Sequence, residues 1–137
     1  ALQGTVVSTP TSDATGSSGM SAFSEQELAY LAEQKLGRIA TIDAAGYPHV
    51  VPVGWSYNAE LDTIDVGGRK PEATQKFRNA ERHAKVAFVI DDVLPPWRPR
   101  CVMIRGTART IPPQATEGAL IRITPEKIVS WGLDQQP

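Results

Sequence analysis

The pattern that most constrains this chain is a series of short strand-forming segments, separated by turns, that runs through most of its length. The clearest is Lys85–Asp91 (KVAFVID), whose apolar run is typical of a buried strand. Residues 47–57 contain Pro48 and Pro52, which cannot donate ladder hydrogen bonds, so we expect this strand to lie at a sheet edge or to leave some positions unpaired. The other predicted strands are residues 38–42, 63–67, 101–111, 119–123 and 127–131. Because strands do not alternate regularly with helices, the pattern predicts an antiparallel barrel of about six strands and not a Rossmann sheet.

Two helices are predicted beside the strands. Ser24 and Glu27 form a capping box, in which each side chain satisfies the free backbone N–H group of the other residue. We therefore expect a helix over residues 25–36, ended by Gly37 in a left-handed conformation. A short internal helix is predicted over residues 71–79.

Length and composition exclude several classes of protein. The 137 residues suit one domain, expected over residues 23–134, after a flexible tail or expression-derived segment over residues 1–22. A net charge of −1 gives no general attraction to nucleic acid or to an anionic membrane. No apolar run approaches the roughly 20 residues of a membrane span, and no secretory signal is visible, so we expect a cytoplasmic protein. Cys101 is the single cysteine, so no disulfide or Cys-based metal site is expected.

The distribution of charge points to an anion. Six of the fourteen Lys and Arg residues lie between Arg69 and Lys85, where only Glu72 and Glu81 oppose them, so this basic segment carries +4 and the rest of the chain −5. Just before it, Gly67-Gly68 leads from a predicted strand towards a helix N-terminus, and such backbone can approach a phosphate closely. The alternative is a solvated basic flank of a helix.

Two further features suggest a planar ligand. A proline-broken edge strand over residues 48–55 leaves backbone donors and acceptors free for the rim of a heterocycle, although it can equally be a bent barrel strand. Trp97 and Trp131 are large rings that could cover a ligand or a subunit interface, or could pack peripherally. Four arginines could form a second basic patch, although alternate residues of a strand more often face water; they are Arg98, Arg100, Arg105 and Arg109. The two histidines, His49 and His83, are expected to be structural or exposed.

The order of motifs resembles a known family. The segments RIATID, GYPHVVPV, QKFRNAER and KVAFVIDD look like the pyridoxamine 5′-phosphate oxidase-like split barrels. More narrowly, VLPPWRPR and the ending IRITPEKIVSWGLD resemble the actinobacterial branch of deazaflavin (coenzyme F420) dependent oxidoreductases, which includes reductases of tetracycline-type antibiotic pathways. The resemblance covers about residues 23–134. It implies a mainly β, six-stranded antiparallel split barrel that forms a homodimer, with cofactor sites built from both subunits.

The resemblance also implies roles for particular residues. Lys76 would bind the cofactor phosphate. In relatives, an arginine often occupies a position just before this lysine, where this chain has Thr74 and Gln75, so Arg69 or Lys70 would take over that contact. Val51, Pro52 and Val53 would run along the isoalloxazine-type ring. Trp97 would close the site, and Trp131 would be supplied near it by the other subunit.

The sequence offers no obvious catalytic acid, base or nucleophile, which suits a cofactor that carries the hydride itself. The loop over residues 112–118 is short, so we expect this chain to lack a helix that borders the substrate in longer relatives. The predicted function is therefore an oxidoreductase that uses coenzyme F420 to transfer a hydride to or from a small organic molecule. The alternatives are an FMN-dependent enzyme of the same fold and a non-catalytic protein that stores or carries such a cofactor.

Overall fold

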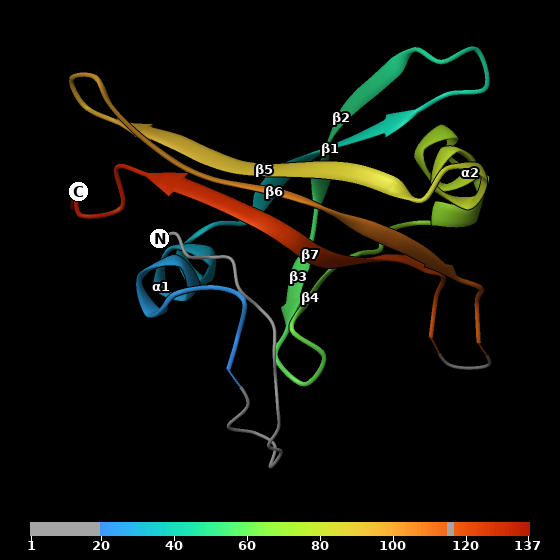
Figure 1. The fold of residues 1–137 in the computed structure, drawn as a ribbon, viewed down its shortest axis with the longest axis horizontal. Coiled ribbons are helices and arrows are strands. Elements are labelled where there is room, and N and C mark those ends of the chain that lie inside the picture. The colour runs from blue at the N-terminus through green and yellow to red at the C-terminus, as the bar shows by residue number, and fades with distance from the viewer. Residues whose placement is uncertain (1–19, 115–116) are drawn as a thin grey trace.

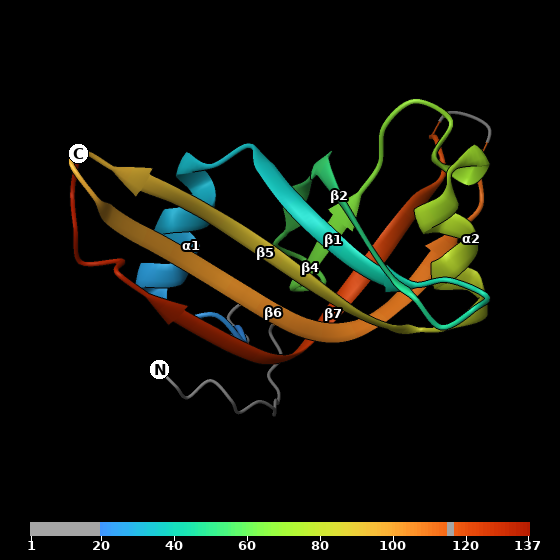
Figure 2. The same ribbon diagram turned by 90° about the horizontal axis from the view of Figure 1, so that it is seen from above.

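A seven-stranded antiparallel sheet curls around one apolar core and carries two α-helices (Figure 1, Figure 2). The structure, a computed structural model, describes residues 20–114 and 117–137. The helical elements are α1 (Glu25–Glu33), the single 3₁₀ turn η2 (Pro71–Ala73) and α2 (Gln75–Arg82). The strands are β1 (Leu36–Ile42), β2 (Pro48–Gly54), β3 (Ser56–Asn58), β4 (Thr63–Val66), β5 (Lys85–Leu94), β6 (Arg98–Ile111) and β7 (Leu120–Trp131). Their spatial order is β2-β1-β5-β6-β7-β4-β3. The predicted mainly β split barrel with an N-terminal and an internal helix is confirmed.

The strand count is seven because the predicted strand over residues 47–57 divides at Trp55. β2 and β3 are consecutive in the chain but lie at opposite edges of the sheet, so the chain crosses the open side of the barrel at Trp55. The predicted edge position of the proline-containing strand is confirmed. The two predicted strands over 119–123 and 127–131 form one strand, β7, which is interrupted by a register shift opposite Arg105 and Gly106.

The capping box at the start of α1 is present as predicted. Ser24 Oγ accepts from the Glu27 backbone N–H at 3.0 Å, and a Glu27 carboxylate oxygen accepts from the Ser24 N–H at 2.8 Å. The predicted helix end is wrong, because α1 stops at Glu33. Gly37 belongs to β1 instead, and an added Cβ there would lie 2.5 Å from the Phe88 ring. Glycine is therefore needed at residue 37 for close packing and not for a left-handed turn.

The predicted internal helix has two parts. Residues 71–73 form η2, and Thr74 then caps α2, which extends to Arg82, by accepting from the Phe77 N–H. Residues 95–97 form the turn of a long β5–β6 hairpin.

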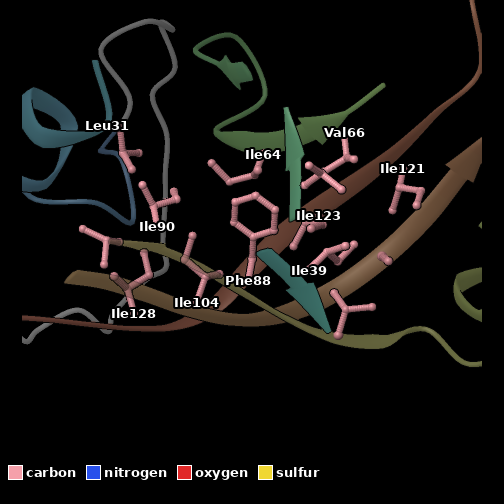
Figure 3. Close-up of a cluster of buried hydrophobic side chains, with 14 of the residues drawn as sticks. Leu31, Ile39, Ile64, Val66, Phe88, Ile90, Ile104, Ile121, Ile123 and Ile128 are labelled. Carbon is pink, nitrogen blue, oxygen red and sulfur yellow. The ribbon is translucent and has the colours of Figure 1, made fainter. Parts of the chain in front are cut away.

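The core lies on the inner face of the sheet, on the side of the helices (Figure 3). Phe88 is 1% exposed and stands among isoleucines from the neighbouring strands, while α1 and α2 contribute Leu31 and Phe77. On β5 and β6 most even-numbered residues are buried and most odd-numbered residues are accessible, which gives the sheet an inner and an outer face. Among the described residues, no helix has the length and apolar character needed to cross a membrane.

A buried charge network joins α1 to the β5–β6 hairpin. Arg100, which is 3% exposed, donates from Nε and Nη2 to the Asp92 carboxylate at 2.9 and 2.7 Å, and its guanidinium lies 4.9 Å from the centre of the Tyr30 ring. Tyr30 Oη also donates to Asp92 at 2.8 Å, and Glu33 lies 3.4 Å from Arg100. The hydrogen bonds from Arg100 hold the pKa of Asp92 below its usual range.

We expect Asp92→Asn to lower the free energy of unfolding by about 3 kcal/mol at pH 7, because it leaves the Arg100 charge buried with only Glu33 nearby. Arg38→Gln is the matched control, since it breaks the exposed Arg38–Asp91 pair and should change stability by about 1 kcal/mol or less. Urea unfolding followed by circular dichroism measures both. Because the Asp92 pKa is lowered in the folded state, this stabilisation is present above about pH 4 and is lost as the pH falls further. Equal effects of the two substitutions would contradict the account.

Candidate cofactor site

The basic segment runs from the loop after β4 through the turn η2 and helix α2 to the first residue of β5. Gly68 (φ 127°) and Lys70 (φ 49°) adopt left-handed conformations, which turn the chain sharply from β4 into η2. Gly67, Arg69 and Lys70 are exposed, and Lys76 in the first turn of α2 is half-buried. The turn and the first helical turn therefore present backbone N–H groups and cations to the same region.

The cations of this segment form no ion pairs within the described part of the chain. None of its six cations takes part in an ion pair with the described carboxylates, whereas Arg38, Arg100 and Arg122 all do. Arg78 and Arg82 donate only to carbonyl and side-chain amide oxygens. Burial lowers the pKa of Lys76, because a partly desolvated ammonium with no anion beside it is disfavoured. An anion bound here would compensate the charge and raise the pKa of Lys76 again.

A polar contact between α2 and β1 holds the basic helix beside the β1–β2 hairpin. Asn79, which is fully buried, donates to Thr41 Oγ1 at 3.0 Å and accepts from Gln75 Nε2 at 2.6 Å and Arg82 Nη2 at 3.0 Å. The Gln75 side chain is thus engaged within the protein, while Lys76 has no such contact among the described residues. The side chain of Thr41 lies across from His49 of β2.

Strand β2 supplies the second part of the site. As an edge strand it is paired only with β1, so its outward-pointing backbone groups are free. Val51 and Val53 point inward, and Pro52 is exposed on the outer face. Two ring nitrogens at either end of this stretch, His49 Nδ1 and Trp55 Nε1, are buried without a hydrogen-bond partner in the described part of the chain. Unsatisfied buried groups of this kind are rare and commonly await a ligand or a water.

These two nitrogens were missed by sequence reasoning, which treated His49 as structural or exposed. The register of β2 and the crossing at Trp55 decide which nitrogens become buried, and neither can be read from residue order alone.

Trp97 and Trp131 lie at the opposite end of the molecule. Trp97 is in the turn of the β5–β6 hairpin and is 74% exposed, and Trp131, which pairs with Cys101 at the end of β7, is 49% exposed. Helix α2 precedes the start of β5, while Trp97 follows its end. A ten-residue strand is about 30 Å long, so one subunit does not bring Trp97 to Lys76 (Figure 1, Figure 2).

The predicted second basic patch separates into two parts. Arg100 is buried in the charge network, and Arg98 donates to the backbone oxygens of Pro95 and Gln136, so these two arginines hold the C-terminal segment. Arg105 and Arg109 are exposed on the outer face and belong to none of the described ion pairs.

The titratable groups with the largest shifts are structural. Burial and an Asp92 hydrogen bond raise the pKa of Tyr30, and burial with a hydrogen bond to Asp62 raises the pKa of Tyr57 to about 12. Burial raises the pKa of the Cys101 thiol to about 11, so it is not a ready nucleophile. The described residues contain no group of three potential metal ligands.

Comparison with known proteins decides the family. Residues 23–137 match the sequence profile of pyridoxamine 5′-phosphate oxidase. The chain belongs to this family. It is 41% identical over 120 residues to the 5a,11a-dehydrotetracycline/5a,11a-dehydrooxytetracycline reductase of Streptomyces rimosus, an alignment that covers 82% of this chain and 84% of the relative.

Solved structures agree on the oxidase-like fold. The FAD binding protein from Mycobacterium smegmatis superposes with a TM-score of 0.61 at 27% identity, covering 79% of this chain and 93% of that protein. A conserved hypothetical protein from Mycobacterium tuberculosis has a TM-score of 0.66 at 20% identity, covering 84% and 90%. At that identity the second match shows the fold alone.

Lys76→Ala should weaken binding of a phosphorylated flavin-type cofactor about tenfold to a hundredfold, since a charge-assisted contact contributes roughly 1.5–3 kcal/mol. Lys85→Ala is the control, because Lys85 is in the same basic segment but begins β5, beyond the far end of α2. Fluorescence titration with FMN and with F420 gives both affinities. Unchanged affinity of the Lys76 variant for both cofactors would remove this residue from the site.

Proposed function

We propose that this protein is an oxidoreductase that binds coenzyme F420 and transfers a hydride between it and a small unsaturated or carbonyl-bearing molecule. One observation carries the proposal: the cations on α2 and just before it, including the half-buried Lys76, form no ion pair with the described carboxylates and lie near the β1–β2 hairpin with its free edge strand. The family membership and the 41% identity to a reductase support an enzymatic role. That relative is a 5a,11a-dehydrotetracycline/5a,11a-dehydrooxytetracycline reductase, so a substrate of this chemical class is the first candidate.

Different residues of this chain would bind different parts of the cofactor. Lys76 would hold the phosphate, and Arg69 or Lys70 would add positive charge. The backbone from Gly67 through Thr74 to Gln75 would form the cradle around the phosphate. The free edge of β2 over Val51, Pro52 and Val53 would lie along the ring. When bound, the deazaflavin or flavin supplies the hydride, and the protein positions the substrate and excludes water.

Two alternatives remain within the same fold. FMN in place of F420 is favoured by the match to an FAD binding protein, since a flavin could use the same cradle. The second alternative is a protein that only stores or carries the cofactor. Spectra of the purified protein with each cofactor separate F420 from FMN, and turnover with a reducible substrate separates an enzyme from a carrier.

We further propose that the site is shared by two subunits of a homodimer. Trp97 and Trp131 are too far from Lys76 to serve the same cofactor within one subunit, as the length of β5 requires. A second copy that reverses the strand direction would bring its exposed tryptophans towards the basic end of the first. Substrate and cofactor would then lie between the subunits.

Sedimentation equilibrium should report about twice the chain mass of 14.8 kDa. A two-subunit site needs the dimer, so dilution below the dimer dissociation constant should also weaken cofactor binding. A monomer that binds cofactor tightly would contradict the shared site.

The choice of cofactor predicts a difference in salt dependence. F420 carries an acidic tail beyond its phosphate, and Arg78 and Arg82 are exposed cations beyond Lys76 that could attract it. Exposed charges contribute little individually and are screened by salt. Raising the salt from about 50 to about 300 mM should therefore weaken F420 binding more than FMN binding. Tighter FMN binding at both salt concentrations, with no steeper dependence for F420, would favour the FMN enzyme.

A further inference from the structure

One buried nitrogen of the candidate site has no part in the phosphate cradle or in the ring contact. His49 Nδ1 is buried and has no hydrogen-bond partner within the described part of the chain. The other such nitrogen, Trp55 Nε1, lies past the opposite end of β2, where the indole packs against Phe88 with ring centroids 6.2 Å apart. His49 is therefore the unpaired group whose partner should be sought near the basic helix.

The strand register puts His49 on the inner face of the sheet, on the side of α2. His49 stands directly opposite Thr41 of β1, and residues opposite one another in an antiparallel pair share one face of the sheet. Thr41 is 1% exposed and accepts a hydrogen bond at 3.0 Å from Asn79 of α2. Both views of the fold show the β1–β2 turn at the same end of the molecule as α2 (Figure 1, Figure 2). His49 is thus one cross-strand neighbour away from the basic helix.

Thr41 has hydrogen-bonding capacity that matches the free nitrogen. A threonine hydroxyl can donate one hydrogen bond as well as accept. Among the described hydrogen bonds Thr41 Oγ1 only accepts, and no bond joins it directly to His49. The Cβ atoms of directly opposite residues lie about 5 Å apart, a separation that one shared oxygen can bridge. A hydroxyl placed there accepts from Thr41 and donates to His49 Nδ1, so it satisfies both groups.

His49 lies between the two parts of the proposed cofactor site. Lys76, the proposed phosphate ligand, is three residues before Asn79 on α2, so the two are neighbours on one side of the helix. Val51, the first residue of the proposed ring contact, is two residues beyond His49 and points to the same face of the strand. A ligand with its phosphate at Lys76 and its ring at Val51 therefore passes His49.

We propose that His49 and Thr41 together bind one hydroxyl group of the polyol chain that joins the ring to the phosphate in a flavin-type cofactor. This inference rests on the proposed cofactor site and extends it to the linker of the ligand. FMN and F420 both carry a ribityl chain at this place, so the contact is common to both. A hydroxyl suits the two groups because it donates and accepts at once, whereas a phosphate is better held by cations and a ring oxygen only accepts.

The contact would fix the position of the ring more than it would raise the affinity. Leaving a buried ring nitrogen unpaired is unfavourable, and a bound hydroxyl removes that cost. Because water can take the same place in the free protein, the expected gain is that of one neutral hydrogen bond. A hydroxyl held at His49 also limits how far the ring can slide along the free edge of β2, which sets the position of the reactive ring atoms relative to the substrate.

Substitutions at His49 test the contact. His49→Phe keeps a planar ring but removes the nitrogen, and it should weaken cofactor binding about threefold to tenfold, as expected for one neutral hydrogen bond. His49→Asn carries its amide where the histidine has Nδ1 and should retain most of the affinity. His83→Phe is the matched control, since His83 is exposed at the end of α2 and should leave the affinity unchanged. Fluorescence titration with FMN and with F420 measures all four chains, and circular dichroism confirms that each is folded.

A ligand without the hydroxyl groups separates this contact from a general disturbance of the site. In a flavin or deazaflavin whose ring and phosphate are joined by a plain pentyl chain, no hydroxyl reaches His49. The wild-type chain and His49→Phe should therefore bind this analogue equally well. Equal weakening for the natural cofactor and for the analogue would overturn the contact, because the substitution would then disturb the site as a whole.

Nitrogen-15 NMR of the histidine side chains gives a readout that does not depend on affinity. On saturation with the natural cofactor the Nδ1 resonance of His49 should shift, and it should shift less with the pentyl analogue. A resonance that does not move, or that moves equally with both ligands, would overturn the proposal. Either result leaves the phosphate site intact, since Lys76→Ala tests that site separately. A chain that binds neither FMN nor F420 would overturn the proposed function and this contact with it.

Discussion

The β5–β6 hairpin is the constraint on which the rest of the structure depends. Ten residue pairs keep one register from Lys85 and Thr107 to Leu94 and Arg98. That register sends Phe88 and its even-numbered neighbours into the core and leaves Met103 on the outer face. Its length also separates the basic end of the molecule from the tryptophan end, which is why the site proposed above would draw on two subunits. The fold and the spacing of the candidate site residues thus follow from one pairing.

Local interactions explain which parts of the fold could be predicted from sequence. The Ser24–Glu27 capping box, the apolar run of β5 and the edge position of β2 all depend on residues a few positions apart, and all three are confirmed. The end of α1 was predicted wrongly because Gly37 is also what a helix terminus would contain. Its real role, leaving room for the Phe88 ring, involves a residue 51 positions away and has no local signal.

The candidate site, too, could be predicted from sequence only in part. The clustering of cations from Arg69 to Lys85 is a property of the sequence, but their lack of ion pairs with the described carboxylates depends on where those carboxylates lie in the fold. Likewise, four arginines in one strand looked equivalent, and the structure uses Arg98 and Arg100 to hold the C-terminal segment while Arg105 and Arg109 stay exposed. The buried nitrogens of His49 and Trp55 also emerge only from the tertiary arrangement.

The central claim is that uncompensated positive charge around α2 holds the phosphate of a flavin-type cofactor. Its most direct test changes the ligand and leaves the protein untouched: the affinity of the wild-type chain for FMN is compared with that for riboflavin, and the affinity for F420 with that for its chromophore lacking the phosphate. The account predicts that losing the phosphate weakens binding at least about tenfold in the preferred pair, as expected for a charge-assisted contact. Equal affinity with and without phosphate in both pairs would contradict it.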